Sequence, residues 1–310
     1  MASRVLRRLA QALGTLLGGA VITFLMLAAT PGDPAERILT AKGQEAVTPE
    51  AIAALRTELG LDRPLPVRLG DYLRDLVMGD LGSSWSTGRP VVAELGERLP
   101  ATLRLTVAAL GIAVAVSLVL GLAAAWGAGR LLDHVSRTVS MVFLVVPSFL
   151  LGVMILDIVV VRSGVGVVIA DGQWGTVLLP AITLALGAAA SWSRVLRASL
   201  LDARTAPFLM VSRARGTTAL HRMVVHELPN SMPPFITIIG IEVAVLVGGA
   251  PIVESIYSWP GIGRFTVQAV GARDMPVIVG FVMFAIALFV VASLAVDLLT
   301  AAIDPRQRAR

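Results

Sequence analysis

Apolar residues gather in six long runs along the chain, and polar stretches with most of the charged residues separate them. A helix needs roughly 20 mostly apolar residues to cross the ~30 Å hydrocarbon layer of a bilayer. Each run is about that long, so the pattern predicts an all-α integral membrane protein with six transmembrane helices. The predicted spans are residues 9–29, 103–126, 139–161, 177–199, 234–253 and 277–300.

The first run follows Arg4, Arg7 and Arg8, as the apolar part of a signal peptide would. Cleavage would then remove it from the mature protein. However, this run is longer than a usual signal core, and the PGDP sequence at 31–34 is not a small-residue cleavage site. We therefore expect the run to remain as an uncleaved span.

The placement of arginine predicts the orientation, because cytoplasmic loops carry an excess of positive residues. With the N-terminus inside, the two short outer loops hold only Arg162, Arg264 and Arg273, and the long segment after the first span is exempt by its length. We predict that both termini are cytoplasmic and that helix 1 is followed by a long extracytoplasmic loop. The arginines predicted to face the cytoplasm are Arg4, Arg7, Arg8, Arg130, Arg137, Arg194, Arg197, Arg204, Arg213, Arg215, Arg222, Arg306, Arg308 and Arg310.

This pattern divides the chain into three regions. Residues 1–30 are the N-terminal tail and first span, and residues 31–100 are the extracytoplasmic loop region. Residues 101–310 form a five-span core, which contains a basic cytoplasmic loop at 201–233.

The long outer segment has helical patterning of its own. Residues 49–60 read as an amphipathic helix, with Thr48 as its N-cap and Gly60 as its stop. A second helix is predicted over 67–78 and ends near Gly79. The segment is therefore expected to be ordered.

Composition supports the membrane class. The chain has 310 residues, 56% of them hydrophobic, which exceeds the 45–50% typical of soluble domains. It has no cysteine, so disulfides and thiolate metal sites are excluded. The net charge of +5 is carried almost wholly by arginine, with Lys42 as the single lysine. Because the arginines lie beside the apolar runs, we expect no nucleic-acid partner.

Catalytic chemistry has little support. His134, His221 and His226 all fall in predicted cytoplasmic loops, and the chain has no zinc-protease, Walker or nucleophile-elbow motif. The glycine pair in 261–263 reads as a tight turn. We expect no enzyme activity, no catalytic residue and no metal site in this chain.

The basic loop 201–233 has two interpretations. Its arginines could serve only as a topological stop signal. A stop signal does not need Gly216, nor a helix-like block at 203–215 followed by a second block that ends at Leu228 and Pro229. We favour a docking surface for a soluble partner.

Three acids fall inside predicted spans, where an ionisable group usually faces the bundle interior or a wet cavity. Asp157 and Asp297 lie near span ends, so we expect structural roles for both. Glu242 lies near mid-span, where cavity-lining and structural roles weigh about equally. Because no arginine is predicted at its depth, a wet cavity is the simpler solution, and we place Glu242 on the translocation path.

Short blocks in a fixed order carry a family resemblance along almost the full length. They are PGDP at 31–34, ELGLDRPL at 58–65, GDLGSS at 79–84, RLPATL at 98–103, LPA at 179–181, RVLRASLL at 194–201, HELPN at 226–230, VESIYSWPGIG at 253–263, DLL at 297–299 and DPR at 304–306. With these blocks, the chain resembles a permease subunit of a bacterial ABC importer of the oligopeptide/dipeptide/nickel type, and specifically the first of its two permeases.

The cytoplasmic signature of such importers is Glu-Ala-Ala, three residues, Gly, nine residues and Ile-x-Leu-Pro. Gly216 and the Leu-Pro pair are in register, while His226 takes the isoleucine position. The Glu-Ala-Ala positions hold Met-Val-Ser at 210–212, so that triplet is absent. The resemblance assigns coupling to an ATPase to Arg213, Ala214, Arg215, Gly216, His226, Leu228 and Pro229.

The resemblance implies a multi-pass subunit of the bacterial inner membrane that works by alternating access. Its implied partners are a second permease subunit, two ATP-binding subunits, an extracytoplasmic substrate-binding protein and the lipid bilayer. ATP and Mg would bind the partner subunits, and this chain would hold no cofactor. A stand-alone secondary transporter or channel, and a membrane enzyme, are the alternatives. Peptides, nickel or metallophore complexes, glutathione and sugars all remain open as cargo.

Overall fold

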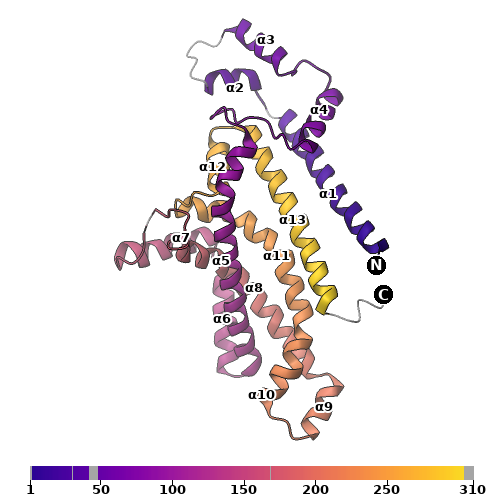
Figure 1. The fold of residues 1–310 in the computed structure, drawn as a ribbon. Coiled ribbons are helices and arrows are strands. Elements are labelled where there is room, and N and C mark those ends of the chain that lie inside the picture. Colours follow the sequence, from indigo (N-terminus) through magenta and orange to yellow (C-terminus); the bar gives the residue numbers. More distant parts are fainter. Residues whose placement is uncertain (1, 30, 42–47, 168, 304–310) are drawn as a thin grey trace. The chain divides into compact units, whose positions relative to one another are not determined.

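The computed structural model describes residues 2–29, 31–41, 48–167 and 169–303, and these ranges are almost entirely helical (Figure 1). Within them the only β-pairing is an isolated bridge between Ser83 and Pro90. The all-α prediction is confirmed for these residues. The helices are α1 (Ala2–Ala28), α2 (Pro34–Ala41), α3 (Pro49–Glu58), α4 (Leu65–Val77), α5 (Val91–Trp126), α6 (Leu131–Val145), α7 (Ser148–Ile155), α8 (Leu178–Arg204), α9 (Pro207–Ala214), α10 (Ala219–Arg222), α11 (Leu228–Ile256), α12 (Ile262–Gly271) and α13 (Met275–Ile303), with π-helical segments η1 (Leu156–Arg162) and η2 (Met223–Glu227).

The chain forms two compact units. Unit 1 comprises Met1–Pro100 and Gly261–Val290, and unit 2 comprises Ala101–Pro260 and Val291–Arg310. The helices α5 and α13 each belong to both units.

Unit 1 contains the outer segment and the helices on which it packs. Its apolar core joins the start of α5 to α12 and α13 through Val91, Leu95, Ile262 and Val277. The patterning of the outer segment is confirmed. Thr48 caps α3 by accepting a hydrogen bond from the Ala51 N–H at 3.3 Å, and Gly60 and Gly79 have φ of 64° and 79° where α3 and α4 end.

The PGDP sequence at 31–34 has a clear structural role in unit 1. Asp33 accepts the Ala35 N–H at 2.9 Å, which caps α2, and it also accepts Arg56 Nη1 from α3 at 2.7 Å. Burial raises the pKa of the Asp33 carboxyl, but the bonds from Arg56 and Ala35 outweigh burial and hold the pKa below its usual value. This carboxylate ties α2 to α3.

Unit 2 is built around α8. The fully buried side chains of Trp192, Leu196 and Leu200 lie on this helix, and α6, α7 and α11 all pack against it. Pro180 lies in the first turn of α8, where proline does not interrupt the helix.

The predicted third span, 139–161, is not one helix. The helix α6 ends at Val145, and the following segment, Ser148–Arg162, is bent from it by 101°. Pro147 stands at the break, and Val146 before it is extended, with φ −73° and ψ 122°. Proline has no N–H and disfavours helical backbone in the residue before it. The prediction of a continuous helix was therefore wrong.

By length and composition, three of the described helices could each cross a membrane, or up to five if each of two bent pairs is one span. The three are Ala10–Ala28, α5 and α8. The second bent pair is Ala219–Val243 with Val245–Ile256, at 49°. The six-span count stays a prediction.

Candidate coupling site

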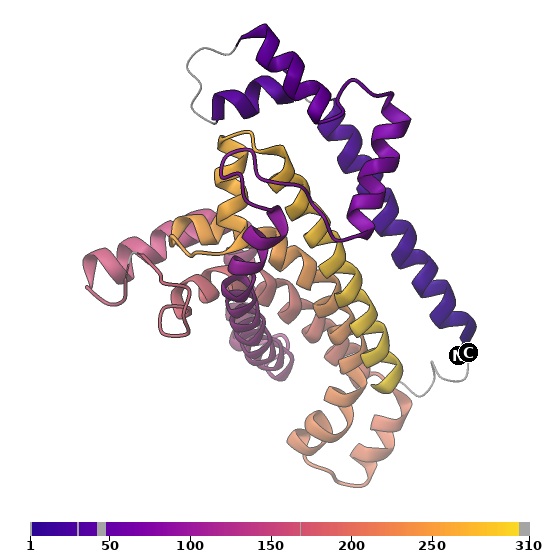
Figure 2. The same cartoon turned by 45° about the horizontal axis from the view of Figure 1, so that its top comes forward.

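The loop predicted at 201–233 is shorter in the structure. The helix α8 continues to Arg204, and α10 and η2 run directly into α11, so only the segment around α9 lies between long helices. The block predicted at 203–215 is interrupted before Pro207, which occupies the first turn of α9. Both views place α9 and α10 at the shared end of α8 and α11 (Figures 1 and 2).

The short helix α9 has one buried face and one exposed face. Leu209 is fully buried and Ser212 is buried beside it. Phe208, Met210 and Val211 are 45%, 67% and 54% exposed. Exposed apolar side chains gathered in one place mark interaction surfaces, so this face fits a protein partner.

A tight turn follows α9 and is fixed by several hydrogen bonds. Gly216 has φ 75°, a left-handed conformation that glycine adopts without strain. Ser212 Oγ and Thr217 Oγ1 are 2.8 Å apart, and Arg222 Nη1 donates to the Thr217 carbonyl. The hydroxyl of Thr218 accepts the His221 N–H and caps α10. These bonds make α9 and α10 a stiff helix–turn–helix.

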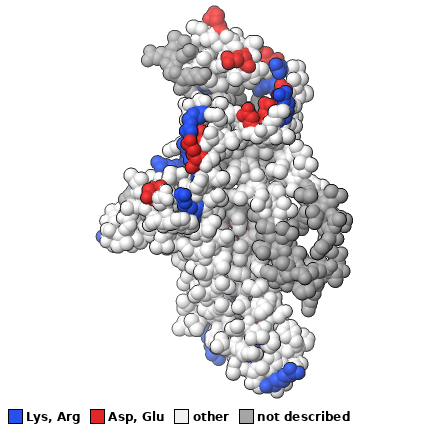
Figure 3. Space-filling model, viewed as in Figure 1, with Lys and Arg blue, Asp and Glu red and all other residues white. Residues whose placement is uncertain are grey.

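The predicted coupling residues divide into two groups. Arg213, Ala214, Arg215 and Gly216 all lie exposed at the end of α9 and in the turn. Figure 3 shows blue, basic atoms at this end of unit 2. This group forms one continuous surface.

The second group lies on the returning chain. The His226 ring is 6.4 Å from Phe208 of α9 and 5.9 Å from His221, edge to face in both cases. Leu228 packs against the core of unit 2 instead of the exposed surface, while Pro229 is exposed. The Leu228 N–H donates to the Met223 carbonyl five residues back, so the chain is π-helical where the motif begins.

Two ion pairs anchor this end of α8. Arg204 donates Nε to Glu227 Oε2 at 2.8 Å and Nη1 to the Ala125 carbonyl at the end of α5 at 2.6 Å. Glu227 is buried, so Arg204 is the cation that balances it. The second pair is bidentate, with Arg197 Nε and Nη2 both 2.7 Å from the buried carboxylate of Asp133. Sequence reasoning missed both pairs, because their partners are 23 and 64 residues apart.

Glu242 has protein partners in the structure. Its carboxylate accepts Ser191 Oγ at 2.9 Å and Trp192 Nε1 at 2.6 Å, both from α8. The sequence argument for water rested on a missing partner, and these two donors remove that premise. The place of Glu242 on a translocation path stays a prediction.

The other acids in the predicted spans are less informative. Asp157 accepts Arg162 Nε at 2.8 Å in an exposed pair, consistent with the structural role predicted for it. Asp297 lies on α13, and its side chain is outside the described part of the structure, as is the DPR block at 304–306. Among the described residues, no three His, Asp or Glu side chains are grouped as a metal site requires.

Comparison with known proteins now decides the family. The model named "Binding-protein-dependent transport system inner membrane component" matches residues 117–309. A second model, "Binding-prot-dependent transport system membrane comp, N-term", matches residues 1–106. The chain belongs to the peptide/nickel family of ABC importer permeases. Such a permease is the membrane subunit of an ATP-driven importer, so the stand-alone transporter and channel are set aside.

Relatives of this permease match it from end to end. The glutathione transport system permease protein GsiC of Salmonella choleraesuis is 36% identical over 308 residues, 99% of each chain. GsiC of Escherichia coli is 34% identical over the same share of both chains. The family is a transport component and indicates no catalytic activity for the permease itself.

Solved structures show a shared fold. The permease resembles the inward-facing MetNI methionine ABC transporter in two crystal forms, with TM-scores of 0.57 and 0.55 and sequence identities of 20% and 18%. Each match covers 68% of this chain and 96% of the other. The helical arrangement in that part of the chain is therefore that of ABC transporter membrane subunits.

Proposed function

We propose that this permease imports short peptides, with glutathione as the leading candidate. The observation that carries the proposal is the 36% identity to a glutathione permease over 99% of both chains. Metal complexes and sugars, which the sequence alone left open, have no comparable support.

The proposed topology has six spans with both termini in the cytoplasm of a bacterial inner membrane. The charge pattern supports it, because exposed arginines gather around α9. In this orientation α9 and α10 face the cytoplasm, and the segment from α2 to α4 faces outward.

The proposed complex contains a second permease subunit, two ATP-binding subunits and an extracytoplasmic binding protein. ATP and Mg bind the ATP-binding subunits. The exposed face of α9, with its arginines and apolar side chains, docks on one of them.

Coupling follows from the stiffness of this region. The hydrogen bonds of the Gly216 turn hold α9 to α10, and the Arg204–Glu227 pair holds α8 to η2, which continues into α11. A movement of the ATP-binding subunit docked on α9 is therefore transmitted to the long helices α8 and α11. A rigid-body switch between inward- and outward-open states requires such a stiff connection.

Reconstituted transport tests the proposal. The complete complex in proteoliposomes, with its binding protein outside, should take up labelled glutathione or tripeptides only when ATP and Mg are enclosed. A matched reaction with a non-hydrolysable ATP analogue should show no uptake. Uptake of a nickel complex, with none of glutathione or any di- or tripeptide, would contradict the proposed cargo.

A further inference from the structure

Unit 1 contains a cavity of about 780 Å³ that has no assigned role. Its walls come from the end of α1, the segment from α2 to α4, the loop 80–88 and the start of α13. This volume is in the usual range for small-molecule sites. In the proposed topology the cavity opens on the extracytoplasmic side.

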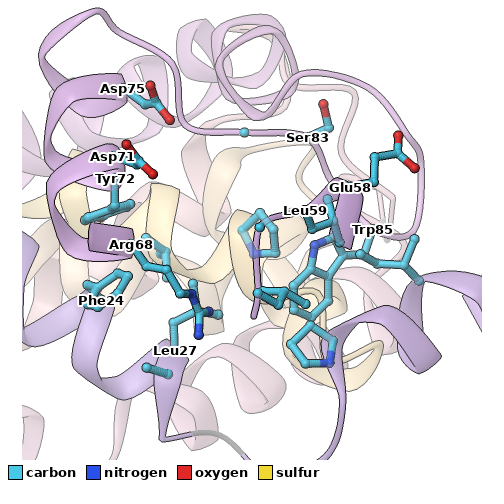
Figure 4. Close-up of a pocket in the computed structure, with 18 of the residues that line it drawn as sticks. Phe24, Leu27, Glu58, Leu59, Arg68, Asp71, Tyr72, Asp75, Ser83 and Trp85 are labelled. Atoms are coloured by element: carbon cyan, nitrogen blue, oxygen red, sulfur yellow. The ribbon is translucent and has the colours of Figure 1, made fainter. Parts of the chain in front are cut away.

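One wall is a single face of α4. The residues Arg68, Asp71, Tyr72 and Asp75 line the cavity at spacings of three, four and seven, which is one face of a helix (Figure 4). Along the helix the face therefore presents a cation, a carboxylate, a hydroxyl group and a second carboxylate.

Two of these charges have no partner among the described residues. Asp71 pairs with Arg63 at 3.2 Å. Neither Arg68 nor Asp75 makes a side-chain ion pair or hydrogen bond with any described residue. A cation and an anion that share one wall without pairing are available to a ligand that carries both charges.

Tyr72 lies between the two charges on the same face. Its hydroxyl is buried and has no hydrogen-bond partner among the described residues, and its ring lies 5.5 Å from that of Phe24. A buried polar atom without a partner is costly and calls for an explanation. Burial raises the pKa of the Tyr72 hydroxyl, so it remains a neutral donor at pH 7.

Trp85 stands across the cavity from α4 (Figure 4). Its loop is held by the buried carboxylate of Asp274, which accepts Ser84 Oγ at 2.5 Å and the N–H groups of Trp85 and Ser86 at 3.1 and 3.0 Å. Three bonds to one buried anion fix this wall in advance, so the cavity is preformed.

The spacing of the charges selects the ligand. Arg68 and Asp75 are seven residues apart on α4, about 10.5 Å along the axis at 1.5 Å per residue. An extended peptide covers roughly 3.3–3.6 Å per residue, so three residues match this length. A phospholipid headgroup is too short, because its ammonium and phosphate are separated by only two carbons.

We propose that this cavity binds a zwitterionic peptide of about three residues before it enters the membrane. The peptide carboxylate lies at Arg68, its ammonium group lies at Asp75, and the Tyr72 hydroxyl donates to a peptide carbonyl. The inference rests on the proposed function. It adds a second peptide site, on the permease itself, to the site on the extracytoplasmic binding protein.

Binding without the binding protein tests the site. The complete permease–ATPase complex is placed in phosphatidylcholine nanodiscs, and triglycine is titrated by ligand-observed NMR. Arg68→Gln and Asp75→Asn should each weaken binding roughly tenfold, the loss of one charge-assisted contact. N-acetyl-triglycine and triglycine amide should bind about as weakly to the unchanged protein.

Two variants sharpen the result. Arg74→Gln removes the same charge from an exposed position on α4 outside the cavity, and it should bind triglycine normally. The exchange Arg68→Asp with Asp75→Arg should restore binding to within a few fold, because the peptide can bind in the reverse direction.

Several results would overturn the inference. One is the absence of triglycine binding to the unchanged protein. Another is equal affinity of Arg68→Gln and Arg74→Gln for triglycine. Native mass spectrometry that finds phosphatidylethanolamine retained through Arg68, without triglycine binding, would make this a lipid site. ATP-driven peptide uptake that persists in the absence of triglycine binding would refute this site alone. Absence of all peptide uptake would refute the proposed function.

Discussion

At the scale of single residues, Gly216 is the sharpest test of the coupling site. Its φ of 75° suits glycine, and a Cβ there would meet no atom within 4 Å. A side chain would therefore be opposed by backbone strain alone, about 1–2 kcal/mol for most residues. We expect Gly216→Val to reach the membrane but to lose most transport and most stimulation of ATPase activity by loaded binding protein.

Asparagine is the matched control, because it tolerates left-handed backbone. Gly216→Asn should keep more than half of the stimulated ATPase activity. Normal transport by Gly216→Val would show that the loop is a passive tether.

Glu242 gives a second prediction at this scale. Gln keeps the shape of the side chain but removes its charge. Its N–H₂ only donates, so its carbonyl oxygen replaces the two carboxylate oxygens that now accept separately from Ser191 and Trp192. We expect Glu242→Gln to change the relative uptake of a panel of charged and neutral peptides by several fold. Glu242→Ala leaves the buried Trp192 Nε1 without an acceptor and should cost about 1–3 kcal/mol of stability.

The control is Ser191→Ala, which removes one donor and leaves the charge in place. It should change stability only slightly and leave the order of cargo preference intact. If Glu242→Gln transports every peptide of the panel at the unchanged rate, and Glu242→Ala prevents assembly, the residue is structural. Its predicted place on the translocation path is then wrong.

At the scale of elements, the anchor between α8 and η2 should be essential. Removing one partner of a buried ion pair leaves an uncompensated charge and costs about 3–5 kcal/mol. Arg204→Gln leaves Glu227 buried without its cation and also frees the Ala125 carbonyl. We expect a clear fall in melting temperature and uncoupled ATPase activity.

Arg194→Gln removes an exposed arginine from the same helix and should melt as the unchanged protein does. If Arg204→Gln and Arg194→Gln melt alike, the buried pair is not an anchor between α8 and η2.

The sequence predicted local elements well and long-range partners poorly. The Thr48 cap and the helix ends at Gly60 and Gly79 depend on neighbouring residues, and the structure confirms them. The break before Pro147 could also have been predicted from the sequence, because proline disfavours a continuous helix. The prediction of the span used hydropathy alone, and hydropathy does not detect such a break. The partners of Asp133, Glu227 and Glu242 come from distant helices, so no local pattern could show them.

At the scale of the whole molecule, the family motifs predicted much of the coupling site around α9. The periodicity of apolar residues predicted little of it. Arg213, Arg215 and Gly216 are all exposed, whereas Leu228 of the same motif is half-buried against the core of unit 2. A motif shows which residues occur together in a family. The packing of the fold determines which of these residues are exposed and can contact a partner.

The motif blocks at 31–34, 58–65 and 79–84 all supply residues to the cavity in unit 1, but the blocks are separate in sequence and did not show that a cavity joins them. The face of α4 that lines the cavity belongs to no block.

Orientation in the membrane is the prediction on which every proposed interface depends. The chain has no cysteine, so single cysteines can be introduced without background. Ser83→Cys places an exposed thiol in the outer segment, and Met210→Cys places one on α9, where the side chain is 67% exposed. Ser212, though also on α9, is a poor reporter because it is buried. In spheroplasts, an impermeant maleimide should label Ser83→Cys and not Met210→Cys, whereas permeabilised cells should show both. Reversed labelling would place α9 outside, where no ATP-binding subunit can reach it, and would overturn the topology and the docking proposal together.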